Sequence, residues 1–209
     1  MLNGARFLAI GAHPDDIEFG CLGTLLKYGS DERVRVVILT AGEFSDNGLD
    51  RGKETKDALA SVGVHDVHVL GFPDGNLYGN LVSNRQTVAA IEHHVKAFSP
   101  TVILTHTPFD THQDHRATYD AVMSAIRMSP VSRITWGGPS STREFSPNLC
   151  VSIDEQWTSK LSALAFHGSQ AHRSYMTVCA LEAAHADRRS VMLGFGKHFE
   201  TLQVREQWA

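Results

Sequence analysis

Four mostly apolar runs of strand length recur in the first half of the chain, and each is followed by a segment with apolar residues at helical spacing. The runs cover residues 6–11, 33–40, 67–72 and 101–106, and the helical segments cover residues 17–28, 50–62, 86–98 and 113–128. A run without polar alternation predicts a strand buried on both faces, which is typical of parallel sheets. The alternation therefore predicts the α/β class, as a Rossmann-like three-layer sandwich with a mostly parallel sheet and right-handed crossovers.

The order of elements is less regular in the second half of the chain. Short β-rich runs at residues 134–136, 149–153 and 201–204 predict three more strands, and residues 155–167 predict a helix that Asp154 would cap. No linker or low-complexity tract divides the 209 residues, a length near the upper end of ordinary single domains. We therefore expect one domain over residues 1–209.

Charge and cysteine usage restrict the class of partner. A net charge of −4 without long runs of like charge argues against nucleic acid and against an anionic membrane surface. The three cysteines are far apart, without the spacing of a thiolate zinc site or a disulfide framework. The N-terminal apolar stretch runs directly into His13 and two aspartates, so it predicts neither a signal peptide nor a membrane span. We expect a cytoplasmic protein with a small-molecule substrate, and the sequence leaves a homo-oligomer open.

Two polar clusters stand where a predicted strand ends and a predicted helix begins. They are His13-Pro14-Asp15-Asp16 and His112-Gln113-Asp114-His115. Each cluster alone would also fit a strand-to-helix turn with a capping aspartate. In open α/β sheets, however, ligands bind outside the carboxyl ends of the strands, where the strand order reverses. We therefore expect the two clusters to form the halves of one metal site.

The residue types in these clusters fit a hydrolytic metal centre. Catalytic zinc typically takes three imidazole or carboxylate ligands and leaves a position for water, and His13, Asp16 and His115 supply such a set. Ferrous iron, cobalt or manganese would also suit these ligands. Asp15 points away from its neighbour at a helix start and remains free to accept a proton from water. Asp114 would orient a ligand histidine through the other ring nitrogen.

These motifs also resemble those of the LmbE-like, or PIG-L-like, zinc-dependent de-N-acetylases. The resemblance lies in Ala12-His13-Pro14-Asp15-Asp16-Ile17-Glu18 with Gly20 and Gly23-Thr24-Leu25, and in His112-Gln113-Asp114-His115. Weaker similarities are Arg51 with Glu54, the segment 71–75, and residues 160–167 with Ser169-Gln170. Together they span most of the chain.

The resemblance implies a reaction and a role for each residue. It implies removal of an N-acetyl or short N-acyl group from an N-acetylglucosamine-type sugar or a sugar-bearing metabolite. By similarity, zinc is bound by His13, Asp16 and His115, and Asp15 is the general base. His112 would stabilise the oxyanion or assist the leaving amine, with Asp114 behind it. Arg51 and Asp74 match positions that hold sugar hydroxyls.

Two other functions remain open from the sequence. One is an amide or ester hydrolase for a non-sugar small molecule, such as an antibiotic intermediate. The other is a binding module without catalysis, which would be expected to lack Asp15 or a metal ligand. Lys197 stands where relatives carry an acidic residue in an Ala-Glu-x-Phe-like element, although Glu200 is close in sequence. This difference leaves the C-terminal wall of the pocket, and so the substrate, unassigned.

Several further residues are given structural roles. Gly20 and Gly23 are expected to allow close packing of the first helix on the sheet. The pair His93-His94 is interpreted as a solvated helix face, and His106 as a structural residue at a strand end. Packing or surface positions are expected for His167, Gln170, His172 and His185.

Overall fold

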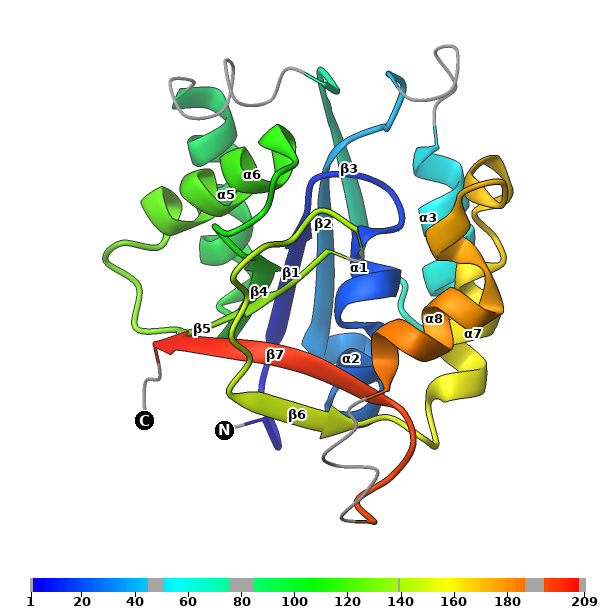
Figure 1. The fold of residues 1–209 in the computed structure, drawn as a ribbon. Helices are drawn as coiled ribbons and strands as arrows, with labels where there is room; N and C mark the ends of the chain where they lie inside the picture. Colours follow the sequence, from blue (N-terminus) through cyan, green and yellow to red (C-terminus); the bar gives the residue numbers. More distant parts are fainter. Residues whose placement is uncertain (1, 45–50, 76–84, 139, 187–193, 207–209) are drawn as a thin grey trace.

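The computed structural model describes residues 2–44, 51–75, 85–138, 140–186 and 194–206, which build one seven-stranded sheet (Figure 1). The strand order is β3-β2-β1-β4-β5-β7-β6. Strands β1 to β5 pair in parallel, whereas β7 is antiparallel to both of its neighbours. The strands are β1 (Phe7–Gly11), β2 (Val34–Thr40), β3 (Val67–Phe72), β4 (Val102–His106), β5 (Ser132–Trp136), β6 (Leu149–Ser152) and β7 (Phe199–Glu206).

Helices cover both faces of the sheet, which confirms the three-layer α/β prediction. Figure 1 shows α5 and α6 on one face and α1, α2, α3, α7 and α8 on the other. The helices are α1 (Asp16–Gly20), α2 (Leu22–Tyr28), α3 (Gly52–Ala60), α5 (Arg85–Phe98), α6 (Gln113–Ala125), α7 (Trp157–Leu164) and α8 (Val178–His185). Three short 3₁₀ helices join them: η1 (Asp31–Arg33), η2 (Gly168–Gln170) and η3 (Ser174–Met176).

Each side of the sheet has its own hydrophobic core, and strand β1 shows how the sequence divides between them. Phe7 and Ala9 belong to the core shared with α1, α2 and α7. Leu8 and Ile10 belong to the core under α5 and α6. Successive side chains of a strand point to opposite faces, so an unbroken apolar run is what a strand covered on both sides requires. No helix in the described part of the chain is long and apolar enough to cross a membrane.

The predicted helix 17–28 is wrong as a single element, because Cys21 interrupts it. Cys21 has φ −151° and ψ 8°, and α2 begins at the next residue. The break exposes backbone N–H groups at the start of α2, and the buried carboxylate of Glu200 accepts them from Gly23 and Thr24 at 2.8 and 2.7 Å. A carboxylate at a helix N-terminus is favourable because it meets free N–H groups and the positive end of the helix dipole. A side chain from β7 thus fixes the start of α2.

The two glycines of this region have the packing role that was predicted. A Cβ on Gly20 would lie 2.5 Å from the Trp136 ring, and a Cβ on Gly23 would lie 2.7 Å from Ile153. These positions therefore allow α1 and α2 to approach the sheet side chains more closely than any larger residue would.

Other expectations need correction. Asp154 does not cap α7, whose N-cap is Gln156. The carboxylate of Asp154 instead accepts the backbone N–H groups of Lys197 and His198. His94 is not on a solvated face, since it is 7% exposed and packs against the His68 ring at 4.7 Å. The last strand is longer than 201–204, and α8, η2 and η3 were not predicted.

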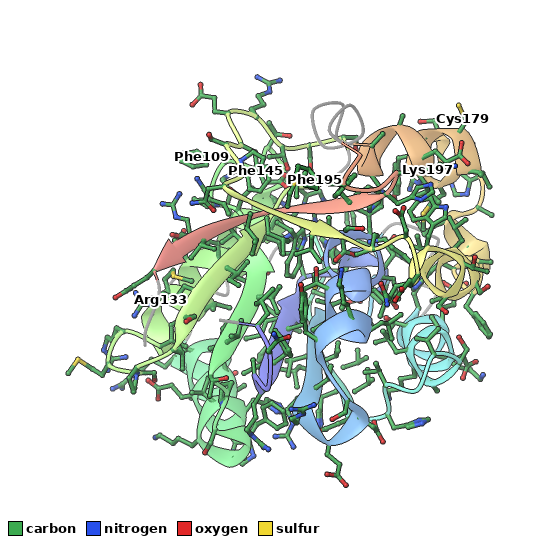
Figure 2. All side chains as sticks on the ribbon, turned by 90° about the horizontal axis from the view of Figure 1, so that it is seen from below. Phe109, Arg133, Phe145, Cys179, Phe195 and Lys197 are labelled. Atoms are coloured by element: carbon green, nitrogen blue, oxygen red, sulfur yellow. The ribbon has the colours of Figure 1, made fainter. Side chains whose placement is uncertain are left out.

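Lys197, which stands where relatives carry an acidic residue, lies outside the candidate site. Lys197 is exposed in the segment before β7, as the view from below shows (Figure 2). The acidic residue of this region is Glu200, which is 2% exposed and bonded to α2 and to Lys160. Neither residue is among the described residues that line the candidate site, so this segment does not build its wall.

Candidate functional site

A cavity of about 280 Å³ opens at the carboxyl ends of the parallel strands. The loops after β1 and β4 supply its histidines and most of its acidic residues, at the point where the chain crosses from one half of the sheet to the other. The lining residues are His13, Asp15, Asp16, Phe19, Phe44, Arg51, Asp74, Gly75, His112, His115, Trp136, Gly138, Ser140, Ser141, Gln170, Arg173, Tyr175 and Met176.

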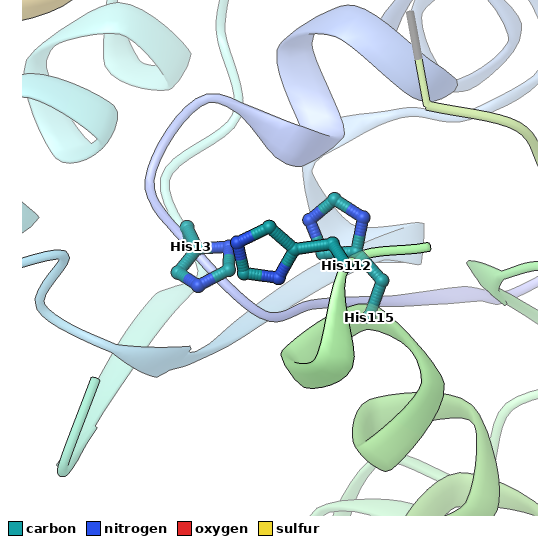
Figure 3. Close-up of side chains that lie close together, drawn as sticks. All are labelled: His13, His112 and His115. Carbon is teal, nitrogen blue, oxygen red and sulfur yellow. The ribbon is translucent and has the colours of Figure 1, made fainter. Parts of the chain in front are cut away.

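Three imidazoles from the two sequence clusters converge at the floor of this cavity (Figure 3). The ring centroid of His13 lies 4.9 Å from that of His112 and 5.3 Å from that of His115. Asp16 reaches between them, with Oδ2 3.6 Å from His13 Nδ1 and Oδ1 3.4 Å from His115 Nε2. The two clusters, about 100 residues apart in sequence, therefore form one site.

The donor atoms suit a divalent transition metal. Candidate ligand atoms lie within 4.8 Å of one another in three overlapping groups. Two of them share His115, one with His13 and His112 and one with Asp16 and His106, so the predicted set of His13, Asp16 and His115 spans these two. The third group joins His13 to Asp74 and Asp114. Mixed imidazole and carboxylate donors fit zinc, iron, cobalt or manganese.

Buried carboxylates hold the rings of both predicted histidine ligands. Asp114 Oδ2 lies 3.3 Å from His13 Nε2, so its carboxylate stands behind His13 and not behind His112. Asp110 Oδ2 lies 3.0 Å from His115 Nδ1. A carboxylate on the second ring nitrogen fixes the tautomer of a ligand histidine and increases its basicity. Asp110 was not predicted, although its place five residues before His115 at the entry to α6 was a usable signal.

His106 also contacts the site, although the sequence gave it no role there. Its Nε2 lies 3.0 Å from Asp16 Oδ2, and its ring stacks on that of His115 with a centroid distance of 4.0 Å. Burial and the neighbouring His115 lower the pKa of His106 to about 4. The backbone N–H groups of Ala12 and His13 donate to the same Oδ2 of Asp16 at 2.9 and 2.7 Å, while the other oxygen of Asp16 faces His115.

Asp15 lines the same cavity as the imidazoles and has a strained backbone conformation. Its φ of 105° is in the left-handed region, which non-glycine residues rarely adopt outside functional sites. The Arg51 guanidinium donates from Nη2 to Asp15 Oδ2 at 2.9 Å. Burial raises the pKa of Asp15 to about 6, and the charge of Arg51 opposes this rise. A carboxylate with a raised pKa is a stronger proton acceptor than an ordinary aspartate.

The pKa of His112 is shifted in the opposite direction from the pKa values of His13 and His115. Burial and the nearby His115 and His13 lower its pKa, which favours the neutral ring. Its Nδ1 accepts the backbone N–H of Asp114 at 3.3 Å, so the proton of a neutral ring resides on Nε2. Although burial acts in the opposite direction, Asp16 and Asp110 raise the pKa of His115 to about 9.

Arg51 and Asp74, predicted to hold sugar hydroxyls, line the cavity but also bond within the protein. Arg51 Nη2 donates to the carbonyl of Pro14 at 2.6 Å in addition to Asp15. Asp74 Oδ1 lies 3.0 Å from His13 Nε2, and its Oδ2 accepts the N–H of Phe44. Their contact with a sugar stays a prediction.

The C-terminal side of the cavity comes from residues 170–176, which carried no motif strong enough to reveal it. Gln170 was expected to pack or to be exposed, and it is buried in the cavity wall. Arg173, Tyr175 and Met176 complete this wall. His167 lies behind it, with Nε2 3.0 Å from the fully buried Glu18.

Two curated relatives share most of this chain. The uncharacterized deacetylase YaiS of Escherichia coli (strain K12) is 35% identical over 170 residues, which cover 78% of this chain and 90% of the relative. A probable N-acetyl-alpha-D-glucosaminyl L-malate deacetylase 2 of Bacillus cereus is 30% identical over 200 residues, which cover 86% of this chain and 87% of the relative.

Solved structures share the fold at lower identity. An N,N'-diacetylchitobiose deacetylase from Pyrococcus horikoshii has a TM-score of 0.76 and 19% identity, covering 96% of this chain and 84% of that one. The 4-carboxy-2-hydroxymuconate hydratase GalB of Pseudomonas putida has a TM-score of 0.79 and 14% identity, covering 98% of both chains. Because a deacetylase and a hydratase share this architecture, likeness at this level shows the fold alone.

A family model described as GlcNAc-PI de-N-acetylase, PIG-L, matches residues 8–126. This range contains more than half of the chain, including both polar clusters and the residues that bring them together. The chain belongs to the PIG-L family.

Proposed function

We propose that this protein is a metal-dependent hydrolase that removes an N-acetyl or short N-acyl group from an acetamido sugar or a metabolite that carries one. The observation that carries the proposal is the placement of Asp15 in the same cavity as Asp16 and the three imidazoles. A non-catalytic binding module has no need of a strained carboxylate beside a complete ligand set. The deacetylase relatives support an amide substrate, and the Bacillus relative supports an acetamido sugar.

The residues of the site divide into a metal-holding set and a proton-handling set. His13, Asp16 and His115 would hold the metal, with Asp114 and Asp110 orienting the two rings. A divalent metal held there would supply polarisation of the amide carbonyl and acidification of a water molecule. Zinc is the metal we propose, while iron, cobalt and manganese suit the same donors.

We assign proton transfer to Asp15, and we assign stabilisation of the oxyanion to His112. Asp15 accepts the proton of the attacking water and then delivers it to the nitrogen of the departing amine. The Nε2–H of neutral His112 donates to the oxygen that becomes negative as the carbonyl carbon turns tetrahedral. Breakage of the C–N bond releases a carboxylate and a free amine, and Arg51 holds Asp15 in place throughout.

The test measures acetate release by metal-loaded protein from N-acetylated sugars, glycosides and nucleosides, with non-sugar acetamides and acetyl esters beside them. We expect activity on at least one acetamido sugar. Activity confined to non-sugar amides or esters would support the other hydrolase that the sequence left open, and metal-loaded protein without activity on any of these compounds would favour the binding module.

A variant pair separates metal binding from proton transfer. Asp15→Asn is expected to keep its metal and to lose roughly 10²- to 10⁴-fold in kcat, the range of a general acid–base contribution. Asp16→Asn is expected to lose both metal and activity. Metal content measured on the same samples distinguishes the two effects. An Asp15→Asn protein with full metal content and turnover within threefold of the wild type would show that Asp15 is not the base.

A further inference from the structure

Arg173 lies in the cavity wall formed by residues 170–176, and hydrogen bonds to Glu54 of α3 hold the start of this wall. Ser169 donates from its backbone N–H and its hydroxyl to the carboxylate of Glu54, at 2.9 and 2.6 Å. The backbone of Arg173 is itself bonded in both directions, donating to Gln170 and accepting from Met176. Arg173 therefore lines the cavity from a segment whose backbone is hydrogen-bonded.

The guanidinium of Arg173 has no counterpart among the described residues. Its Nε is buried and makes no hydrogen bond, and the described part of the chain gives its side chain no ion pair. The other arginine of the cavity differs in this respect, because Arg51 bonds to Asp15 and to the Pro14 carbonyl. Covering part of a cation without a partner costs free energy, and a guanidinium presents paired donors that match carboxylate and phosphate oxygens.

From this contrast we propose that Arg173 forms an anion subsite, and that the substrate carries a carboxylate or phosphate group beyond its acetamido group. The inference rests on the proposed function and adds a substrate class to it. Tyr175, two residues further along the same wall, offers a hydroxyl to the same region. Burial and the charges of Asp15 and Asp16 raise the pKa of Tyr175 to about 12, so this hydroxyl stays protonated and able to donate.

A less specific explanation is that Arg173 only balances the negative charge of Asp15 and Asp16. A balancing charge would act on the whole site and so on every substrate alike. A subsite acts only on substrates that carry the anion. The ratio of kcat/KM between an anionic substrate and its neutral analogue therefore separates the two explanations.

The experiment uses two matched pairs of probes with the metal-loaded full chain. One pair is N-acetylglucosamine 6-phosphate and N-acetylglucosamine. The other is the carboxymethyl glycoside of N-acetylglucosamine and the carboxamide of that glycoside. We expect the wild type to favour the anionic member of at least one pair by roughly tenfold to a hundredfold, the worth of a charge-assisted hydrogen bond. The pair that responds identifies the anion as phosphate or carboxylate.

Variants assign the preference to one side chain. In Arg173→Gln the ratio is expected to fall toward one, and in Arg173→Lys part of it is retained because the charge remains without the paired donors. Arg127→Gln is the matched control, since it removes the same charge from a side chain that is 64% exposed beyond the far end of α6. The control is expected to keep the wild-type ratio.

Three outcomes would overturn the subsite. They are a wild-type ratio near one in both pairs, a wild-type ratio that survives Arg173→Gln, and an equal loss on both members of a pair. Calorimetric binding of glucosamine 6-phosphate and glucosamine to the wild type and to Arg173→Gln gives a readout without turnover. If no acetamide is hydrolysed but the phosphate still binds more tightly through Arg173, the subsite stands and the proposed function fails. If acetamides are hydrolysed without any charge preference, in turnover or in binding, the proposed function stands and the subsite fails.

Discussion

Asp110 holds His115 through a carboxylate-to-imidazole contact of 3.0 Å, and the other oxygen of the same carboxylate accepts the backbone N–H of His112 at 2.8 Å. The Asp110 side chain is fully buried. Despite burial, which acts in the opposite direction, its bond to His115 keeps the pKa of Asp110 well below its usual range. One ionised carboxylate thus orients a predicted metal ligand and fixes the turn that carries the second cluster.

We therefore predict that Asp110→Asn weakens metal binding. An asparagine keeps the shape but removes the negative charge that raises the basicity of His115, and the loss of such a partner typically lowers metal affinity about 10- to 100-fold. Competition against a chelator of known affinity measures the change. Asp120→Asn, on the same helix as His115, is the control and is expected to keep the wild-type affinity. Unchanged metal affinity in Asp110→Asn would show that Asp110 does not support metal binding.

The role of Arg51 is tested by dividing an activity loss between kcat and KM. Because its guanidinium bonds to Asp15 and Pro14, Arg51→Gln is expected to lower kcat about tenfold or more with a smaller effect on KM. Arg51→Lys recovers part of the activity, since an ammonium cannot reproduce both bonds in the same geometry. Arg35→Gln, which breaks a similar pair with Asp66, is the control. A change in KM alone would support contact with a sugar hydroxyl.

The buried pair of Lys160 and Glu200 is expected to matter for stability. Both side chains are at most 1% exposed, so Lys160→Met would leave the Glu200 carboxylate without its opposite charge and with only the N–H groups of α2 to hold it. A loss of about 3–5 kcal/mol in the free energy of unfolding is expected, and the double variant with Glu200→Gln recovers part of it. Lys53→Met is the control from an exposed pair, where a change of about 0.5 kcal/mol or less is expected. Urea denaturation measures all three, and equal losses for Lys53→Met and Lys160→Met would contradict the argument.

His94 gives a prediction for the pH dependence of stability. Burial and the neighbouring His68 lower its pKa to about 4, whereas an unfolded histidine titrates near 6.5. Between these values the unfolded chain binds the proton and the folded chain does not, so His94 stabilises the fold less as pH falls from about 6.5 to 4. His94→Gln should therefore flatten the slope of unfolding free energy against pH in this window. His93→Gln, which removes an exposed imidazole from the same helix, is the control, and an unchanged slope in His94→Gln would refute the assignment.

The sequence predicted the sheet and the convergence of the two clusters because both follow from local signals. Continuous apolar runs indicate strands buried on both faces, and parallel strands bring their carboxyl ends to one edge. His13 and His112 follow strands β1 and β4, which are neighbours in the sheet, so both residues lie at the same point of that edge. Their exact partners depend on ring orientation, which is why Asp114 was assigned to the wrong histidine and Asp110 was overlooked.

Features that depend on distant contacts were not predictable in this way. The break at Cys21 is accompanied by a contact with Glu200, which is about 180 residues away and accepts the N–H groups of Gly23 and Thr24. The wall that carries Arg173 has little periodicity, because short 3₁₀ turns leave no helical or strand pattern in the sequence. The sequence thus supports the metal centre better than the specificity of the site.

The place of β7 in the sheet has a consequence for how this protein matures on the ribosome. β7 is translated after every other described strand, yet it lies between β5 and β6, and among the described strands β6 pairs with β7 alone. While residues 199–206 are still inside the exit tunnel, β6 has no neighbour to join and Lys160 has no carboxylate to meet. A nascent chain that already displays both polar clusters must therefore wait for residues 199–206 before the half of the molecule around α7 can close.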